Sequence, residues 1–125
     1  TKWTSTQDRD LYRLVGYLQH SRHLRMIGWV GDSLDSVQPH LFADADFAGC
    51  VLTQRSTSGA HLTLRGPNTS FPITGLSKRQ GCVSHSTPGA ELVSFDQALR
   101  LMGLPGMLIW DAILPKKACS SLPRR

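Results

Sequence analysis

Three acidic residues have the types and the spacing that a metal site needs. Asp44 and Asp46 lie in the apolar run LFADADF, and Glu91 is the only glutamate among the 125 residues. Alternate residues of a strand point to one face, and a carboxylate in an apolar strand is costly to bury unless it is paired or binds a metal. Three carboxylates from a strand and a following helix can therefore converge on a hard cation such as Mg²⁺. The alternative is that Asp44 ends the strand and starts an Asx-type turn, which leaves Asp46 exposed.

The histidines and cysteines give no comparable pattern. The five histidines include no H-E-x-x-H motif, and His20 and His23 lack further ligands nearby in the sequence. The three cysteines, Cys50, Cys82 and Cys119, are widely spaced and form no C-x-x-C pair. We therefore expect neither a zinc site nor a disulfide framework, and reduced thiols fit an intracellular protein.

Length and composition limit the class of protein. A chain of 125 residues suits one domain, and a hydrophobic content of 40% is too high for an intrinsically disordered chain. No apolar run approaches the roughly 20 residues that span a bilayer, and the first residues lack the hydrophobic region of a signal peptide. We therefore expect an intracellular protein with no membrane segment.

The positive charge is concentrated at the carboxyl end. The chain has a formal charge of +5, with 14 Lys and Arg against nine Asp and Glu. Four of these bases lie in the last eleven residues, which leaves ten bases against nine acids in residues 1–114. A basic tail can bind nucleic acid non-specifically, but it is also a common form of solvated terminus.

Local patterns predict the elements that must position the acids. The capping box Thr4-x-x-Gln7, followed by leucine and valine at helical spacing, predicts a packing helix that ends near Ser21. Alternation and turn residues predict strands over residues 24–30, 40–45, 60–64 and 70–77.

A second helical region is predicted after the strands. Thr87 is a suitable N-cap and Pro88 suits the first helical position, which predicts a helix from Pro88 to Met102. The sequence GLPG at residues 103–106 predicts a break before a short apolar helix over 107–114. The final residues, 115–125, show no periodicity and are expected to be disordered.

This order of elements predicts an α+β or mixed α/β domain with flanking helices. We expect a connecting helix and strand over residues 1–38, a compact domain over 39–114, and the basic tail over 115–125.

Four segments, in order and at compatible spacing, resemble the ribonuclease H domain of copia-type retrotransposon polyproteins. The family pattern is Asp-Ala-Asp-(aromatic)-Ala-Gly, Arg-Ser-Thr-Ser-Gly, Ser-Lys-(Lys/Arg)-Gln and Ser-Thr-x-x-Ala-Glu. These motifs stand at residues 44–49, 55–59, 77–80 and 86–91. The resemblance implies an incomplete ribonuclease H-like mixed sheet, with residues 39–114 as the partial domain.

The resemblance also implies a function. Such enzymes cut the RNA strand of an RNA–DNA hybrid with two Mg²⁺ ions held by four carboxylates. By position, Asp44 is the first catalytic and metal-binding carboxylate and Glu91 is the second; Asp46 belongs to the motif but is not assigned as a ligand. The resemblance further implies that the hybrid backbone is contacted by Arg55, Ser56, Thr57, Lys78 and Arg79. The alternative is that these five are ordinary surface residues.

The chain departs from the family in its acids. Gly89 stands where the family usually carries an additional acidic residue, and neither Asp96 nor Asp111 matches the third or fourth carboxylate. We therefore expect a fragment of such a domain that is inactive or nearly so alone, with an unpaired edge at the strand around Asp44. The alternatives are a non-catalytic remnant that binds nucleic acid and an unselected product without function.

Overall fold

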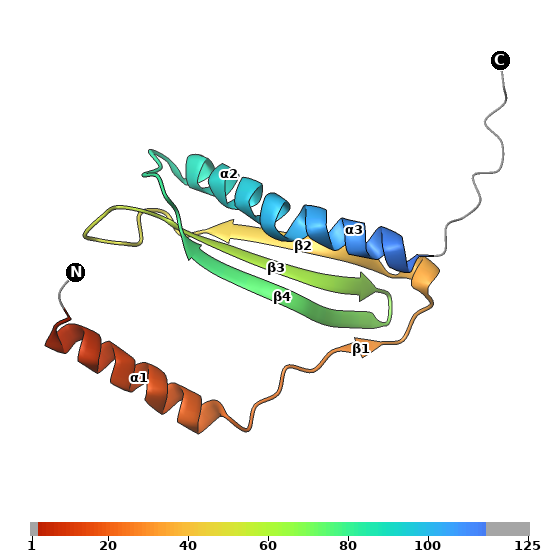
Figure 1. The fold of residues 1–125 in the computed structure, drawn as a ribbon, viewed down its shortest axis with the longest axis horizontal. Helices are drawn as coiled ribbons and strands as arrows, with labels where there is room; N and C mark the ends of the chain where they lie inside the picture. The colour runs from red at the N-terminus through yellow and green to blue at the C-terminus, as the bar shows by residue number, and fades with distance from the viewer. Residues whose placement is uncertain (1–2, 115–125) are drawn as a thin grey trace, which may run out of the picture.

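The computed structural model describes residues 3–114, so the tail expected over 115–125 lies outside the described residues. The order of elements is the expected helix, strands and final helices, and the fold is mixed α+β (Figure 1). The helical elements are α1 (Ser5–Ser21), the 3-10 turn η1 (Leu34–Ser36), α2 (Thr87–Ala98), the π-helical segment η2 (Leu99–Gly103) and α3 (Leu104–Ile113). The strands are β1 (Trp29–Val30), β2 (Gln38–Ala45), β3 (Thr57–Gly66) and β4 (Thr69–Arg79).

The four strands form one antiparallel sheet in the order β1-β4-β3-β2. Within residues 3–114, β2 therefore has an unpaired edge, as expected for the strand that holds Asp44. The strand predicted over 24–30 is wrong in extent, because only Trp29 and Val30 pair with β4. The other three strands are longer than predicted. Helices α2 and α3 lie along one face of the sheet (Figure 1).

The start of α2 differs from the prediction by one residue. Ser86, not Thr87, is the N-cap, and its hydroxyl accepts a hydrogen bond from the Gly89 N–H at 3.2 Å. Pro88 lies in the first turn, where a missing N–H removes no helical bond. The cap therefore anchors the helix that carries Glu91.

The predicted break at residues 103–106 is wrong. The backbone stays helical from α2 through η2 to α3, and the π-helical segment falls directly before the turn that contains Pro105. Proline removes one backbone donor and crowds the preceding turn, and a wider π turn accommodates both effects without ending the helix.

Helix α1 forms as predicted, with the capping box of Thr4 and Gln7 present, but it buries none of its residues. Leu11, Leu14 and Leu18 remain about half exposed, so the expected packing of this face is not observed among the described residues. No helix within residues 3–114 combines the length and the apolar character that a membrane span requires.

The interface between helices and sheet is thinly packed. Among the described residues, the buried hydrophobic side chains are few, and half of them are alanines. A hollow of about 300 Å³ remains between α3 and the sheet, lined in part by Leu62, Ile73 and Trp110. The free energy of unfolding is a small difference between the large contributions of burial and conformational entropy. Each buried hydrogen bond at this interface is therefore a large share of the net stability.

Candidate carboxylate site and basic end

Asp44 and Glu91 lie at the same end of the sheet. Asp44 is the penultimate residue of β2, which runs toward the amino-terminal end of α2 (Figure 1). Glu91 is the fifth residue of α2, and its side chain is half-buried. Ala45, next to Asp44, is buried, so strand alternation directs the exposed Asp44 carboxylate to the face away from α2.

A buried serine joins the strand of Asp44 to the helix of Glu91. Ser94 lies about one helical turn after Glu91 and is fully buried. Its hydroxyl donates to the carbonyl oxygen of Asp44 at 2.5 Å, with a longer 3.3 Å contact to the carbonyl of Gly59. Ala90 and Ala98, on the same stripe, are also fully buried, and these small side chains let the helix approach the strands closely enough for this bond.

A buried glutamine joins the remaining motif segments. Gln80 is 1% exposed, and its side-chain amide donates to the Ser58 hydroxyl at 3.1 Å and to the Ala90 carbonyl at 2.9 Å. Its side-chain carbonyl accepts a hydrogen bond from the Ser84 hydroxyl at 3.2 Å. Together with Ser94, this residue links all four motifs, which are far apart in the sequence, into one polar network.

The expected contact from Ser56 to nucleic acid is corrected. Ser56 is fully buried, and its hydroxyl accepts a hydrogen bond from the Ala48 N–H at 3.1 Å. The hydroxyl is thus occupied by the loop between β2 and β3 and does not reach solvent. Thr57, the next residue, is half-buried and keeps its side chain on the outer face of the sheet.

Asp46 closes this loop rather than joining a metal site. Its Oδ1 accepts a hydrogen bond from the Thr57 N–H, and its own N–H donates to the Thr57 carbonyl at 3.2 Å. A Cβ at Gly49 would clash with Asp46 Oδ2, so the glycine is needed for the carboxylate to sit there.

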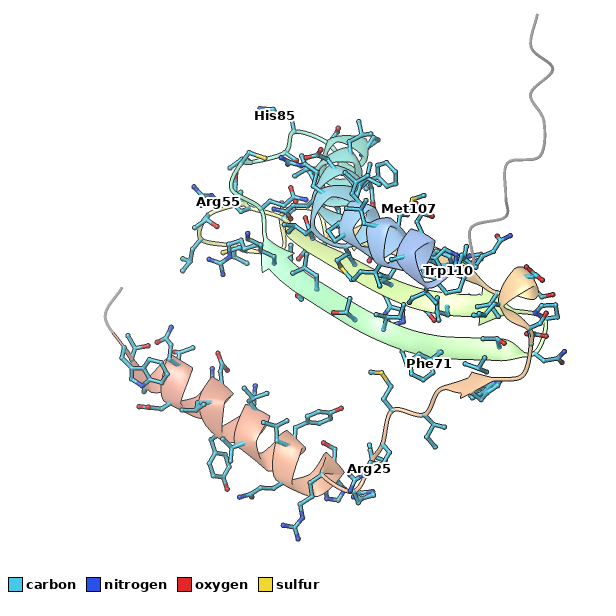
Figure 2. The ribbon with its side chains drawn as sticks, turned by 45° about the vertical axis from the view of Figure 1, so that its right-hand side comes forward. Arg25, Arg55, Phe71, His85, Met107 and Trp110 are labelled. Atoms are coloured by element: carbon cyan, nitrogen blue, oxygen red, sulfur yellow. The ribbon has the colours of Figure 1, made fainter. Side chains whose placement is uncertain are left out.

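Three of the exposed basic residues lie at this same end of the molecule. Lys78 and Arg79 end β4 opposite Ser58 and Thr57, and Arg55 precedes β3 in the loop. Figure 2 shows Arg55 at the end of the sheet where the segment before α2, with His85, also lies. Hydrogen bonds from the Thr53 hydroxyl and N–H, and the nearby Arg79 charge, lower the pKa of the Cys50 thiol, which indicates that Arg79 lies near the loop.

The described residues do not by themselves fit a metal pair. Asp44 and Glu91 offer the hard oxygen donors that Mg²⁺ prefers. The Asp44 carboxylate, however, points to the sheet face away from α2, whereas Glu91 lies on α2, so the two carboxylates do not converge on one ion in this fold. Within residues 3–114, moreover, no group of three or more His, Cys, Asp or Glu side chains is placed to hold a metal ion. Asp46 adds no third ligand, because its carboxylate is held by the Thr57 backbone.

Three structural residues escape prediction from the sequence. Ser94 shares the mostly small or apolar helix face of Ala90 and Ala98, which predicts packing but not its hydrogen bond to β2, and no local pattern marks Gln80 as buried. Asp32 accepts hydrogen bonds from the Thr69 hydroxyl at 2.7 Å and from the Asn68 N–H at 2.8 Å, and so ties the segment after β1 to the β3–β4 turn. Gln80 belongs to one of the four motifs, which marks it as a residue of interest. The motif, however, implies nucleic-acid contacts for the neighbouring Lys78 and Arg79 and does not predict that Gln80 is buried.

Comparison of the chain with models of protein families, with curated proteins and with solved structures gives no match. The site geometry and the resemblance of the four motifs are therefore the basis on which a function is proposed.

Proposed function

We propose that the chain is a partial ribonuclease H-like domain of retrotransposon origin that binds RNA–DNA hybrids, with Asp44 and Glu91 as two carboxylates of the ancestral hydrolytic site. The single observation that carries the proposal is the shared polar network of the four motifs. Ser94 and Gln80 bring the segments of Asp44 and Glu91 to one end of the sheet. Arg55, Lys78 and Arg79 supply exposed positive charge at that end.

The chain alone is expected to cleave a hybrid slowly or not at all. The family chemistry uses four carboxylates with Mg²⁺, and only Asp44 and Glu91 stand at matching positions. Each missing ligand leaves positive charge uncompensated, and the Asp44 carboxylate points away from the helix that carries Glu91, so a metal pair is bound poorly.

The test is binding and cleavage of a labelled RNA–DNA hybrid by the full chain, with and without Mg²⁺. Salt-sensitive binding with little cleavage is expected, and any Mg²⁺-dependent cleavage should disappear in Asp44→Asn and Glu91→Gln. Failure to bind a hybrid at low salt contradicts the proposal. Robust cleavage that both variants retain contradicts the assignment of the two carboxylates.

The second candidate is a non-catalytic remnant that binds nucleic acid. The exposed bases at the end of β4 favour it, because phosphate contacts need charge but no metal. Binding that is unchanged in Asp44→Asn and does not distinguish a hybrid from duplex DNA supports this candidate over the first.

A further inference from the structure

We propose that the sheet face opposite α2 binds single-stranded nucleic acid by stacking bases on Phe42, His40 and His61. This inference goes beyond the proposed function, because it concerns base stacking by residues outside the four motifs and a different nucleic acid structure.

Strand alternation separates this face from the helices. Leu41 and Leu62 point to the helix side, where a Cβ at Gly103 would lie 3.0 Å from Leu41 and a Cβ at Gly106 would lie 2.9 Å from Leu62. Their neighbours Phe42 and His61 therefore point to the other side, and they are direct cross-strand partners. We call the outward side chains of β2 and β3 around this pair the ring face.

The ring face presents three flat side chains and one guanidinium. Phe42 is 46% exposed, and the His40 ring stacks beside it at 6.4 Å between centroids with an angle of 25°. The guanidinium carbon of Arg65 lies over the Phe42 ring at 6.0 Å from its centroid. Aromatic rings with an adjacent arginine on an open antiparallel sheet are the arrangement on which successive bases stack.

The floor beside the rings is flat. Gly75 lies opposite His61 on β4, and Gly59 lies opposite Asp44 on β3. A Cβ at either glycine would make only ordinary contacts, none closer than 3.7 Å, and without a side chain both positions leave the sheet surface low beside His61. A planar base can therefore lie against the sheet next to His61.

Charge and composition favour a polyanion over a protein partner. Among the outward residues of β2 and β3, Phe42 is the only large apolar side chain, whereas a protein interface core is richer in such residues. Arg65 stands at one end of this side of the sheet and Arg79 at the other, with Asp44 as the acid between them. At the usual rise of a strand, β3 from Thr57 to Arg65 spans roughly 27 Å, which suits a site of a few nucleotides.

The test uses fluorescence anisotropy of a labelled thymidine oligonucleotide with the full chain at low salt. Phe42→Ala is expected to weaken binding by about fivefold or more, because the site loses the ring on which a base stacks. Phe47→Ala is the matched control, since Phe47 is also 46% exposed but lies in the loop after β2, and it should change binding by less than about twofold.

Two further arms keep the proposal testable if Phe42→Ala folds poorly. Gly75→Val suits a strand and should block the floor, weakening binding while circular dichroism stays unchanged. An abasic oligonucleotide of equal length should bind at least about fivefold more weakly than the thymidine strand, because it cannot stack. Equal binding of the abasic strand, or unchanged binding by both Phe42→Ala and Gly75→Val, overturns the proposal and assigns any affinity to phosphate contacts alone.

Discussion

The hydroxyl of Ser94 donates to the main-chain carbonyl of Asp44 at 2.5 Å, across the interface between α2 and the edge strand β2. The bond ties the first acid of the candidate site to the helix that carries Glu91. Because it uses the backbone of Asp44, it leaves the carboxylate unoccupied by the helix. The placement of Asp44 against the helix of Glu91 therefore depends on a residue outside the candidate site.

Ser94→Ala should destabilise the fold by about 1–2 kcal/mol, because the hydrogen bond from the buried Ser94 hydroxyl to the Asp44 carbonyl would be lost. Denaturant unfolding measures the change. Ser77→Ala is the control, since Ser77 is exposed on β4, and it should stay within about 0.5 kcal/mol of the original chain. Equal stability of the two variants would show that the Ser94 bond contributes nothing.

Gly49→Ala and Asp46→Ala should have nearly the same effect, each costing about 1 kcal/mol. The Cβ added at Gly49 must displace the Asp46 carboxylate, which then no longer accepts the bond from the Thr57 N–H. In a double-mutant cycle, the double variant should lose at most about 0.3 kcal/mol more stability than either single variant. Full additivity of the two changes would contradict this coupling.

The strands around the motifs could be predicted because alternation and turn residues are local signals. The capping box at Thr4 and the start of α2, to within one residue, could be predicted for the same reason. The π turn before Pro105 was not, since packing of η2 against Leu41 keeps the helix together where propensity predicts a break. The burial of Ser56 and Gln80 was also out of reach, because their partners come from other segments and only the fold supplies them.

Asp32 should make stability depend on acid pH. Hydrogen bonds from the Thr69 hydroxyl, and from both amides of Asn68, lower the pKa of Asp32 below its ordinary 3.8. The folded pKa is lower than the unfolded one, so the contribution is complete above about pH 4 to 5 and is lost as the pH falls through the folded value. Urea midpoints measured between about pH 6 and about pH 3 should fall less steeply in Asp32→Asn than in the original chain.

Asp35→Asn is the control for this pH series. Asp35 lies in the neighbouring η1 turn, is exposed, and makes no side-chain hydrogen bond within residues 3–114. Its variant should keep the original pH dependence. If Asp32→Asn and Asp35→Asn give the same curve, the Asp32 cluster is not the source of the acid sensitivity.

Removing positive charge at the end of β4 should weaken hybrid binding and make the binding constant depend less steeply on salt concentration. Eliminating one phosphate contact reduces the slope of log K against log salt by roughly 0.9, so the double variant of Lys78 and Arg79 to Ala should reduce it by about 1.8. Arg13→Ala removes an exposed charge on α1 and should leave the slope nearly unchanged, because α1 stands apart from the sheet (Figure 1). Binding isotherms between low and moderate salt give both slopes. An equal change per charge removed in the two variants would mean that net charge, not the position of Lys78 and Arg79, governs binding, and the proposed hybrid interface would then lose its support.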